Sequence, residues 1–243
     1  ASSGSPAPNI VFMLLESTFD IEKSFVLSSP MGERLFSANK YTKLLSPFRV
    51  NAVGGGTWVT EFETIVGIDS RMFGYYGGYT HSTISPLIRR SFATYLSGKG
   101  YSTTAVYPVS GAFFNARNAY RNYGFQRFFD ADDLSLHPGW GVIRDPEIVE
   151  RAKGVLAKSS QPFFAYVLTV ENHAPHNCAD PAAQDGSGLR LAHAPDFAGN
   201  CAIGVYRDRL FPGALFYPYC YLSHQRGSSR LVVSRGVSDL LPI

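Results

Sequence analysis

The sequence predicts an α/β fold in which a mostly parallel sheet is flanked by helices. Residues 10–15 and 162–170 are continuous apolar runs, a pattern typical of strands buried on both faces of a parallel sheet. Patterns of helix type lie between these runs along the chain. Because alternating strands and helices favour a parallel sheet, we expect functional side chains to gather at the carboxyl ends of its strands.

The first predicted strand starts after Pro8-Asn9 and ends before Glu16-Ser17. Residues 57–67 then read as a helix. Thr57 is a suitable N-cap, and Glu61 supplies acidic character to the first turn.

A second helix is predicted to begin at Ser85, with Pro86 at its first position. Gly98 or Gly100 would end it. The apolar residues at helical spacing would share one face: Leu87, Ile88, Phe92, Tyr95 and Leu96.

The remaining recognisable elements continue the alternation. Residues 101–107 are predicted as a strand, and 145–156 as a helix that starts at Asp145-Pro146-Glu147. The strand over residues 162–170 ends in Glu171-Asn172-His173. Glu16 and His173 therefore both lie at predicted carboxyl ends of strands.

Composition excludes several classes of protein. The chain has 243 residues, of which 45% are apolar, so it can bury a sizeable core and is not a disordered chain. Only 17% of residues are charged, the net charge is +3 and no basic stripe is present, which argues against a nucleic-acid binder. The longest clean apolar run, residues 10–15, is far shorter than the roughly 18 residues of a membrane helix.

The cysteines and the first residues say little about chemistry. The spacing of Cys178, Cys201 and Cys220 matches no zinc pattern, and an odd number suits no closed disulfide framework. Residues 1–8 are rich in Ser, Pro and Ala and are predicted to be a linker. We expect a catalytic domain cut from a longer protein, although a processed N-terminus would have the same composition.

The last quarter of the chain differs in composition. Residues 181–243 contain six Arg and four Asp but no Lys or Glu, whereas residues 1–180 contain six Lys and eight Glu. The apolar run over residues 210–219 is predicted to be broken by its prolines. A distinct subdomain or an out-of-frame translation would both produce such a shift.

Two residues are candidates for metal and nucleophile chemistry. Glu16 directly follows a buried strand, where it is either a polar strand end or a hard oxygen ligand for a divalent cation. Thr57 follows Gly54-Gly55-Gly56 at a predicted helix N-terminus, which favours a phosphate or sulfate group. Its hydroxyl is either an ordinary cap or a nucleophile activated by a metal.

Further candidates could contact an anionic substrate. His173 at a strand end could bind an anionic oxygen or protonate a leaving group, or it could be a structural histidine. Asn115, Arg117 and Asn118 form a polar group after Phe113-Phe114. Arg117 could hold a phosphate through two hydrogen bonds, or could be a plain surface arginine.

Five segments, taken in order, resemble the sulfatase-like branch of the alkaline phosphatase superfamily. The similarity is greatest to the lipoteichoic acid synthase and phosphoglycerol transferase group, and it covers residues 8–177. The segments are Asn9 to Ser17, Gly54 to Phe62, Tyr107 to Tyr120, Tyr123 to Asp130, and Leu168 to Pro175.

The resemblance implies a role for each matching residue. Glu16 matches the metal ligand on the family's first strand, and Thr57 matches its nucleophile, which also contacts the metal. His173 matches a histidine that binds the phosphoryl or leaving group. Arg117, with Asn115 beside it, lies where the family places substrate-binding residues. The implied metal is Mn²⁺, Mg²⁺ or Zn²⁺.

The resemblance also implies a location and partners. Domains of this group sit outside the cytoplasmic membrane, in the periplasm or on its outer face, behind N-terminal membrane helices. The expected substrates are phospholipids or glycans of the cell envelope, and no nucleic-acid partner is expected.

The sequence departs from the family at the metal site, because the family completes that site with an Asp-His pair and this chain contains no Asp-His dipeptide. We therefore expect a sulfatase-like segment over residues 9–177 and an atypical tail over 178–243, so that the α/β fold is incomplete at its C-terminus. The expected activity is metal-dependent phosphoryl, phosphoglycerol or sulfate-ester transfer or hydrolysis through Thr57, absent from the chain as written. A non-catalytic domain that binds anionic glycans or lipid head groups is the alternative.

Overall fold

The computed structural model describes residues 7–16, 38–48, 50–52, 56–136, 143–171, 173, 214–220 and 229–234. Within these ranges the strands are β1 (Asn9–Leu15), β2 (Thr42–Phe48), β3 (Ser102–Val106), β4 (Arg127–Phe129), β5 (Phe163–Thr169), β6 (Ala214–Cys220) and β7 (Ser229–Ser234). The α-helices are α2 (Thr57–Val66), α3 (Thr80–Thr83), α4 (Phe92–Ser97), α5 (Ala116–Asn122) and α6 (Asp145–Leu156). Short 3-10 helices span Ser70–Tyr79, Ser85–Leu87 and Phe113–Asn115.

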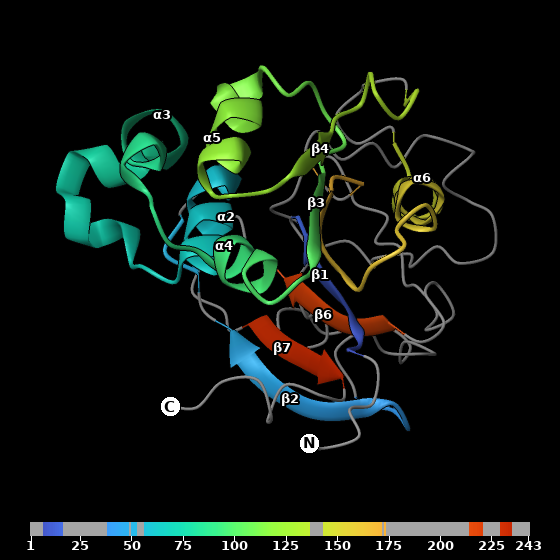
Figure 1. Ribbon diagram of the computed structural model, residues 1–243. Helices are drawn as coiled ribbons and strands as arrows, with labels where there is room; N and C mark the ends of the chain where they lie inside the picture. The colour runs from blue at the N-terminus through green and yellow to red at the C-terminus, as the bar shows by residue number, and fades with distance from the viewer. Residues whose placement is uncertain are drawn as a thin grey trace, which may run out of the picture.

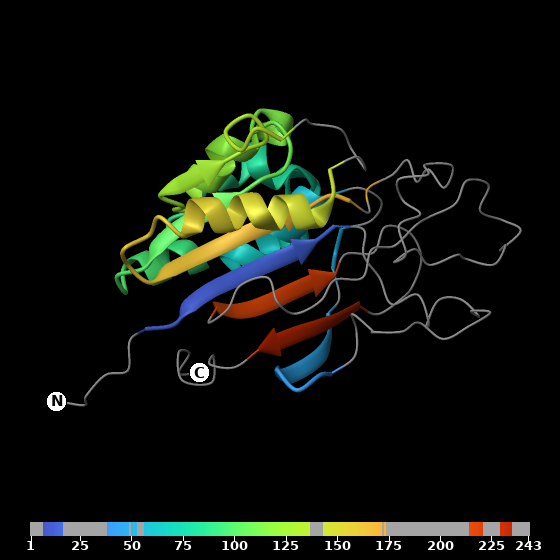
Figure 2. The same cartoon turned by 90° about the vertical axis from the view of Figure 1, so that its right-hand side faces the viewer.

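A five-stranded sheet with the order β4-β3-β5-β1-β6 forms the centre of the described structure, and its paired strands are all parallel. Helices α2, α4 and α5 lie on one side of this sheet and α6 on the other (Figures 1 and 2). The predicted α/β class, with a mostly parallel sheet flanked by helices, is confirmed. The predicted strands over 10–15, 101–107 and 162–170 correspond to β1, β3 and β5.

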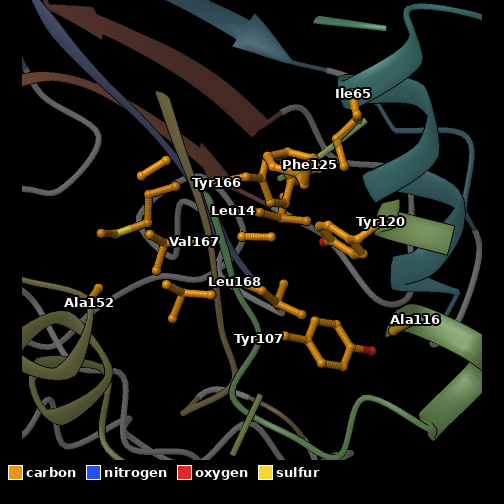
Figure 3. Close-up of a cluster of buried hydrophobic side chains, with 14 of the residues drawn as sticks. Leu14, Ile65, Tyr107, Ala116, Tyr120, Phe125, Ala152, Tyr166, Val167 and Leu168 are labelled. Atoms are coloured by element: carbon orange, nitrogen blue, oxygen red, sulfur yellow. The ribbon is translucent and has the colours of Figure 1, made fainter. Parts of the chain in front are cut away.

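The core lies on both faces of the sheet, as the apolar runs predicted. Successive residues of β5 point to opposite faces. Figure 3 shows Tyr166 among Tyr120 and Phe125 on the side of α2 and α5, whereas Val167 lies toward Ala152 of α6. The ring centroids of Tyr120 and Tyr166 are 5.8 Å apart. Burial of large apolar groups on both faces stabilises the central strands and fixes where their carboxyl ends lie.

The sheet includes a strand from the last quarter of the chain. The expectation that prolines prevent a strand within residues 210–219 is wrong, because β6 pairs in parallel with β1 and places Pro218 opposite Met13. β6 is an edge strand of the five, and proline is tolerated there since one side of an edge strand needs no backbone N–H donor. β7 pairs antiparallel with β2 in a separate two-stranded sheet. The other tail residues lie outside the described ranges.

Two predicted helix starts are corrected by the structure. Thr57 is the first residue of α2 and not its cap, since Gly56 holds the N-cap position. Glu61 lies beyond the first turn and is buried, so that turn contains no acidic residue.

The helix predicted from Ser85 is broken into two parts. Residues Ser85–Leu87 form a 3-10 turn, after which the chain extends at Ile88. Ser91 then caps α4 through a reciprocal pair of hydrogen bonds with Thr94. This capping box starts a new helix, and as a result Leu87 does not share its buried face and is 70% exposed.

None of the helices in the described part of the chain is both long enough and apolar enough to cross a membrane.

Candidate active site at the carboxyl edge of the sheet

The order of the strands brings Glu16 and His173 to one edge of the sheet. β1 and β5 are neighbours and run parallel, with Leu15 opposite Thr169. Glu16 follows Leu15 directly, and His173 follows the last residue of β5 by four positions. The two side chains meet there: His173 Nε2 lies 4.0 Å from Glu16 Oε1.

Thr57 reaches the same place from the first turn of α2. Its hydroxyl donates a hydrogen bond of 2.5 Å to Glu16 Oε1, across 41 positions of sequence. Both residues are buried, with Glu16 4% and Thr57 6% exposed. The two residues that the family resemblance assigns to one metal therefore lie side by side at the carboxyl edge of the sheet.

The electrostatic setting of Glu16 suits a nearby cation. Burial raises the pKa of Glu16 above its ordinary value, while the Thr57 hydrogen bond and the His173 ring act in the opposite direction. A buried carboxylate keeps its charge more readily when a positive group or donors face it. Glu16 therefore lies where a cation would remove most of the cost of burying its charge.

The position of Thr57 also suits an anionic substrate. The first N–H groups of a helix have no partner within the helix, and the helix dipole places positive potential at this end. α2 has ten residues and begins at Thr57, so an anion at the Thr57 hydroxyl would lie at this end of the helix. Gly54 and Gly55 of the predicted glycine turn lie outside the described residues.

The oxygen atoms of Glu16 and Thr57 provide part of what a divalent metal requires. Glu16 and Thr57 present a carboxylate and a hydroxyl oxygen side by side, which are hard ligands suited to Mg²⁺ or Mn²⁺. They fit as two members of a ligand set. Within the ranges that the structure describes, no group of three or more His, Cys, Asp or Glu side chains could hold a metal ion.

Arg117 is held by two acidic side chains. Its Nη2 atom is 2.5 Å from Asp130 Oδ2 and 3.0 Å from Asp133 Oδ2. The same Asp130 oxygen accepts the Gly111 backbone N–H at 2.9 Å. The Arg117 side chain is 42% exposed. These contacts tie the loop after β3 to the segment after β4.

Asn115 occupies a backbone region that most residues avoid but that asparagine adopts more readily than others. Its φ is 62°, in the left-handed region, and Phe114 before it has φ 44°. The Asn115 amide donates to the backbone oxygen of His81 at 3.2 Å, and its side-chain oxygen accepts from Asn118 at 2.7 Å. Phe114 stacks on Trp58, the residue after Thr57, with centroids 3.7 Å apart. The segment is thereby attached to the start of α2.

Sequence reasoning missed a buried polar cluster behind Thr57. Glu61, His81 and Tyr120 are each about 1% exposed and come from α2, α3 and α5. The one available signal was the spacing of Glu61, four positions after Thr57, which places both residues on one face of a helix. His81 and Tyr120 carried no such signal, because their proximity depends on the packing of three helices.

Solved structures with this architecture identify the fold of the chain. A protein in the alkaline phosphatase superfamily from Vibrio parahaemolyticus matches with a TM-score of 0.58 and 14% identity, over 97% of this chain and 62% of that one. The lipoteichoic acid synthase LtaP from Listeria monocytogenes has a TM-score of 0.54 and 18% identity, over 73% and 46%. The Streptococcus pyogenes phosphoglycerol transferase GacH, solved with sn-glycerol-1-phosphate, has a TM-score of 0.51 and 20% identity, over 72% and 47%. The fold is thus that of the alkaline phosphatase superfamily.

The chain belongs to the sulfatase family, whose sequence model matches residues 8–189. An uncharacterized protein of Haemophilus influenzae is 29% identical over 70% of this chain and 33% of its own length. The lipoteichoic acid synthase of Staphylococcus saprophyticus is 27% identical over 69% of this chain and 26% of its own length. The chain therefore spans about a third or less of these relatives. The resemblance to the lipoteichoic acid synthase group of the superfamily is confirmed.

Proposed function

We propose that the site at the carboxyl edge performs metal-assisted phosphoryl or phosphoglycerol transfer, with Thr57 as nucleophile and Glu16 as metal ligand. The hydrogen bond of 2.5 Å between their side chains carries the proposal, because it holds a hydroxyl against a buried carboxylate at a helix N-terminus. The phosphoglycerol transferase among the structural neighbours supports the substrate class. Sulfate-ester chemistry is the less favoured variant, since a threonine holds the nucleophile position.

In this mechanism each side chain has a separate task. Glu16 accepts the Thr57 hydroxyl proton in its hydrogen bond and orients the oxygen toward an incoming phosphodiester. Attack of this oxygen on phosphorus forms a phosphothreonine and breaks the bond to the leaving alcohol, to which His173 donates a proton. A bound divalent cation would supply positive charge that favours the ionised nucleophile and the transferring phosphoryl oxygens. A hydroxyl acceptor or water then attacks the phosphothreonine and gives its proton to His173, and the Thr57 oxygen recovers its proton from Glu16 as its bond to phosphorus breaks.

Arg117 and Asn115 are proposed to contact the substrate. Arg117 carries five N–H donors in a fork, so pairing with Asp130 and Asp133 through one terminal nitrogen is compatible with a phosphate contact by the others. Asn115 is linked through Phe114 and Trp58 to the start of the nucleophile helix. Arg117→Lys tests the role: loss of substrate affinity with retained stability supports it, whereas loss of stability alone assigns Arg117 to the loop.

The chain as written is proposed to lack turnover, because the Asp-His pair that completes the family's metal site does not occur in it. Glu16 and Thr57 alone leave the cation short of the usual three or four protein ligands. The complete protein is proposed to act outside the cytoplasmic membrane, anchored by helices that precede this domain. Its substrates would be envelope phospholipids or glycans.

Two preparations test the function. Mn²⁺ titration of the 243-residue chain should broaden the amide signals near Glu16 and Thr57 in NMR spectra, and Glu16→Gln or Thr57→Ala should abolish that broadening. Glu150→Gln, a 64% exposed carboxylate on α6, is the matched control. In a second preparation, the completed chain, residues after 177 are replaced by the corresponding segment of the Staphylococcus saprophyticus synthase.

The completed chain should hydrolyse bis-p-nitrophenyl phosphate and accumulate an adduct at Thr57 that mass spectrometry can locate. Turnover that survives Thr57→Ala would refute the nucleophile. Absence of any Mn²⁺ effect in both preparations would favour a non-catalytic anion-binding domain.

A further inference from the structure

Glu61 is a buried carboxyl group one helical turn behind the proposed nucleophile. Residues four apart on an α-helix lie on the same face, so Glu61 follows Thr57 along the buried side of α2. Its exposure is 1%, and nothing in the mechanism above uses it. A carboxyl group at such a position needs partners, because an unpaired polar group without water is costly.

The partners of Glu61 come from two other helices. The Tyr120 hydroxyl of α5 donates to Glu61 Oε2 at 2.8 Å. His81 Nε2 of α3 lies 3.5 Å from the same oxygen. Neither ring nitrogen of His81 has a hydrogen-bond partner within the described part of the chain, although the ring is 1% exposed. The Glu61 carboxyl thus lies beside an imidazole nitrogen that needs a polar partner.

The same histidine is connected to the loop that carries the proposed substrate residues. The backbone oxygen of His81 accepts hydrogen bonds from Asn115 Nδ2 at 3.2 Å and from Ser85 Oγ at 2.6 Å. Asn115 lies two residues before Arg117. A continuous set of contacts therefore runs from the nucleophile helix, through Glu61 and His81, to the substrate loop.

Burial favours the uncharged form of both members of the pair. Burial raises the pKa of Glu61 to about 8, with a further contribution from Glu16, and burial lowers the pKa of His81 to about 3. The Oε2 atom of a neutral carboxyl group can accept from Tyr120 and also from the Nε2–H tautomer of His81. An ionised Glu61 would instead face Glu16 as a like charge.

We propose that Glu61 is a positioning residue that joins α2 to α3 and α5 through Tyr120 and His81, and so holds the Thr57 hydroxyl against Glu16. The inference rests on the proposed function of Thr57. It requires an acceptor oxygen at position 61 and requires no negative charge there. Glutamine supplies such an oxygen in nearly the same shape, whereas alanine does not.

The test compares variants of the 243-residue chain by NMR. The Thr57 hydroxyl proton, held in a short bond to a buried carboxylate, should give a slowly exchanging signal that Thr57→Ala removes. Glu61→Ala should accelerate its exchange about tenfold or abolish the signal, and Glu61→Gln should restore it. Ile148→Ala, at a fully buried residue of α6 on the opposite side of the sheet (Figure 1), is the matched control that lowers stability away from the cluster.

Mn²⁺ broadening provides a second readout. Glu61→Ala should weaken Mn²⁺ binding about tenfold, the lower end of the effect of groups that support metal ligands, and Glu61→Gln should not. If Glu61→Ala does not fold, Tyr120→Phe removes a single hydroxyl donor and should accelerate Thr57 exchange in a folded chain.

The outcomes separate the two proposals. An unchanged Thr57 signal in Glu61→Ala or Tyr120→Phe overturns the inference, as does equal loss in Ile148→Ala or failure of Glu61→Gln to rescue. A signal that depends on Glu61 in a chain that shows no Mn²⁺ effect supports the positioning role while contradicting the metal site. Mn²⁺ binding that needs Glu16 and Thr57 but is insensitive to Glu61 supports the function and rejects the inference.

Discussion

Asp145 should make the stability of this protein fall as pH rises through the neutral range. It is the first residue of α6 and exchanges hydrogen bonds with Glu171, two residues after β5: the Asp145 N–H donates to Glu171 Oε2 at 2.8 Å, and the Glu171 N–H donates to Asp145 Oδ1 at 3.1 Å. Burial, and then the Glu171 charge, raise the pKa of Asp145 from 3.8 to about 7. The folded protein therefore holds a proton at position 145 that the unfolded chain releases.

The sign and size of the effect follow from proton linkage. Below about pH 4 both states are protonated and the residue makes no pH-dependent contribution. Between the unfolded pKa of 3.8 and the folded pKa of about 7, each pH unit reduces the free energy of unfolding by about 1.4 kcal/mol. The full loss is about 4 kcal/mol, a large part of the stability of a typical domain.

Urea denaturation of wild type and Asp145→Asn, measured at intervals from pH 4 to pH 8, checks the prediction. Asparagine keeps the acceptor oxygen but cannot ionise, so the variant should be close to wild type at pH 4 and progressively more stable than wild type toward pH 8. Glu147→Gln, half exposed in the same turn of α6, is the control and should track wild type. A constant difference between Asp145→Asn and wild type across this range would refute the assignment of a raised pKa.

Three further substitutions test the site and its support. In the completed chain, Thr57→Ala should abolish turnover and lower the free energy of unfolding by about 1–3 kcal/mol, because the buried Glu16 loses its donor; normal kinetics would reject the nucleophile. His173→Ala should lower turnover far more than the melting temperature, since its side chain is 30% exposed; the opposite result would make it structural. Gly111→Ala should destabilise by about 1–3 kcal/mol on thermal denaturation, because a new Cβ would lie 2.8 Å from Asp130 Oδ2; full stability would show that the loop yields.

The central sheet was predictable from runs of consecutive apolar residues in the sequence. β1 is apolar after Asn9 and β5 is apolar up to Thr169, as suits strands covered on both faces, and such runs of consecutive residues can be recognised in the sequence. The parallel pairing then placed Glu16 beside the end of β5 without further information. The contact between Glu16 and Thr57 was predictable through the family resemblance, since their separation of 41 positions has no local signal.

The features that escaped prediction depend on tertiary surroundings. Pro218 is compatible with a strand because β6 lies at a sheet edge, and edge position is not encoded in the run itself. Ser91 starts α4 in place of Ser85 because its side chain bonds Thr94, which outweighs the Pro signal. The partners of Arg117 lie 13 and 16 positions away on another segment. Such choices are decided by which side chains meet after folding.

The place of β6 beside β1 has a consequence for how the chain acquires its structure. β1 is among the first residues of the chain, and the strand that covers its outer edge lies near the other end. Pairings between such distant segments form late, because a long loop must close before any contact compensates the lost freedom. During synthesis the outer edge of β1 therefore remains unpaired until β6 has emerged from the ribosome. A ribosome-bound or prematurely ended chain would present that edge, which is apolar and can recruit strands of other molecules. Because β6 is made late, chaperones should bind the incomplete chain at this stage and bind it less once residues 214–220 have been synthesised.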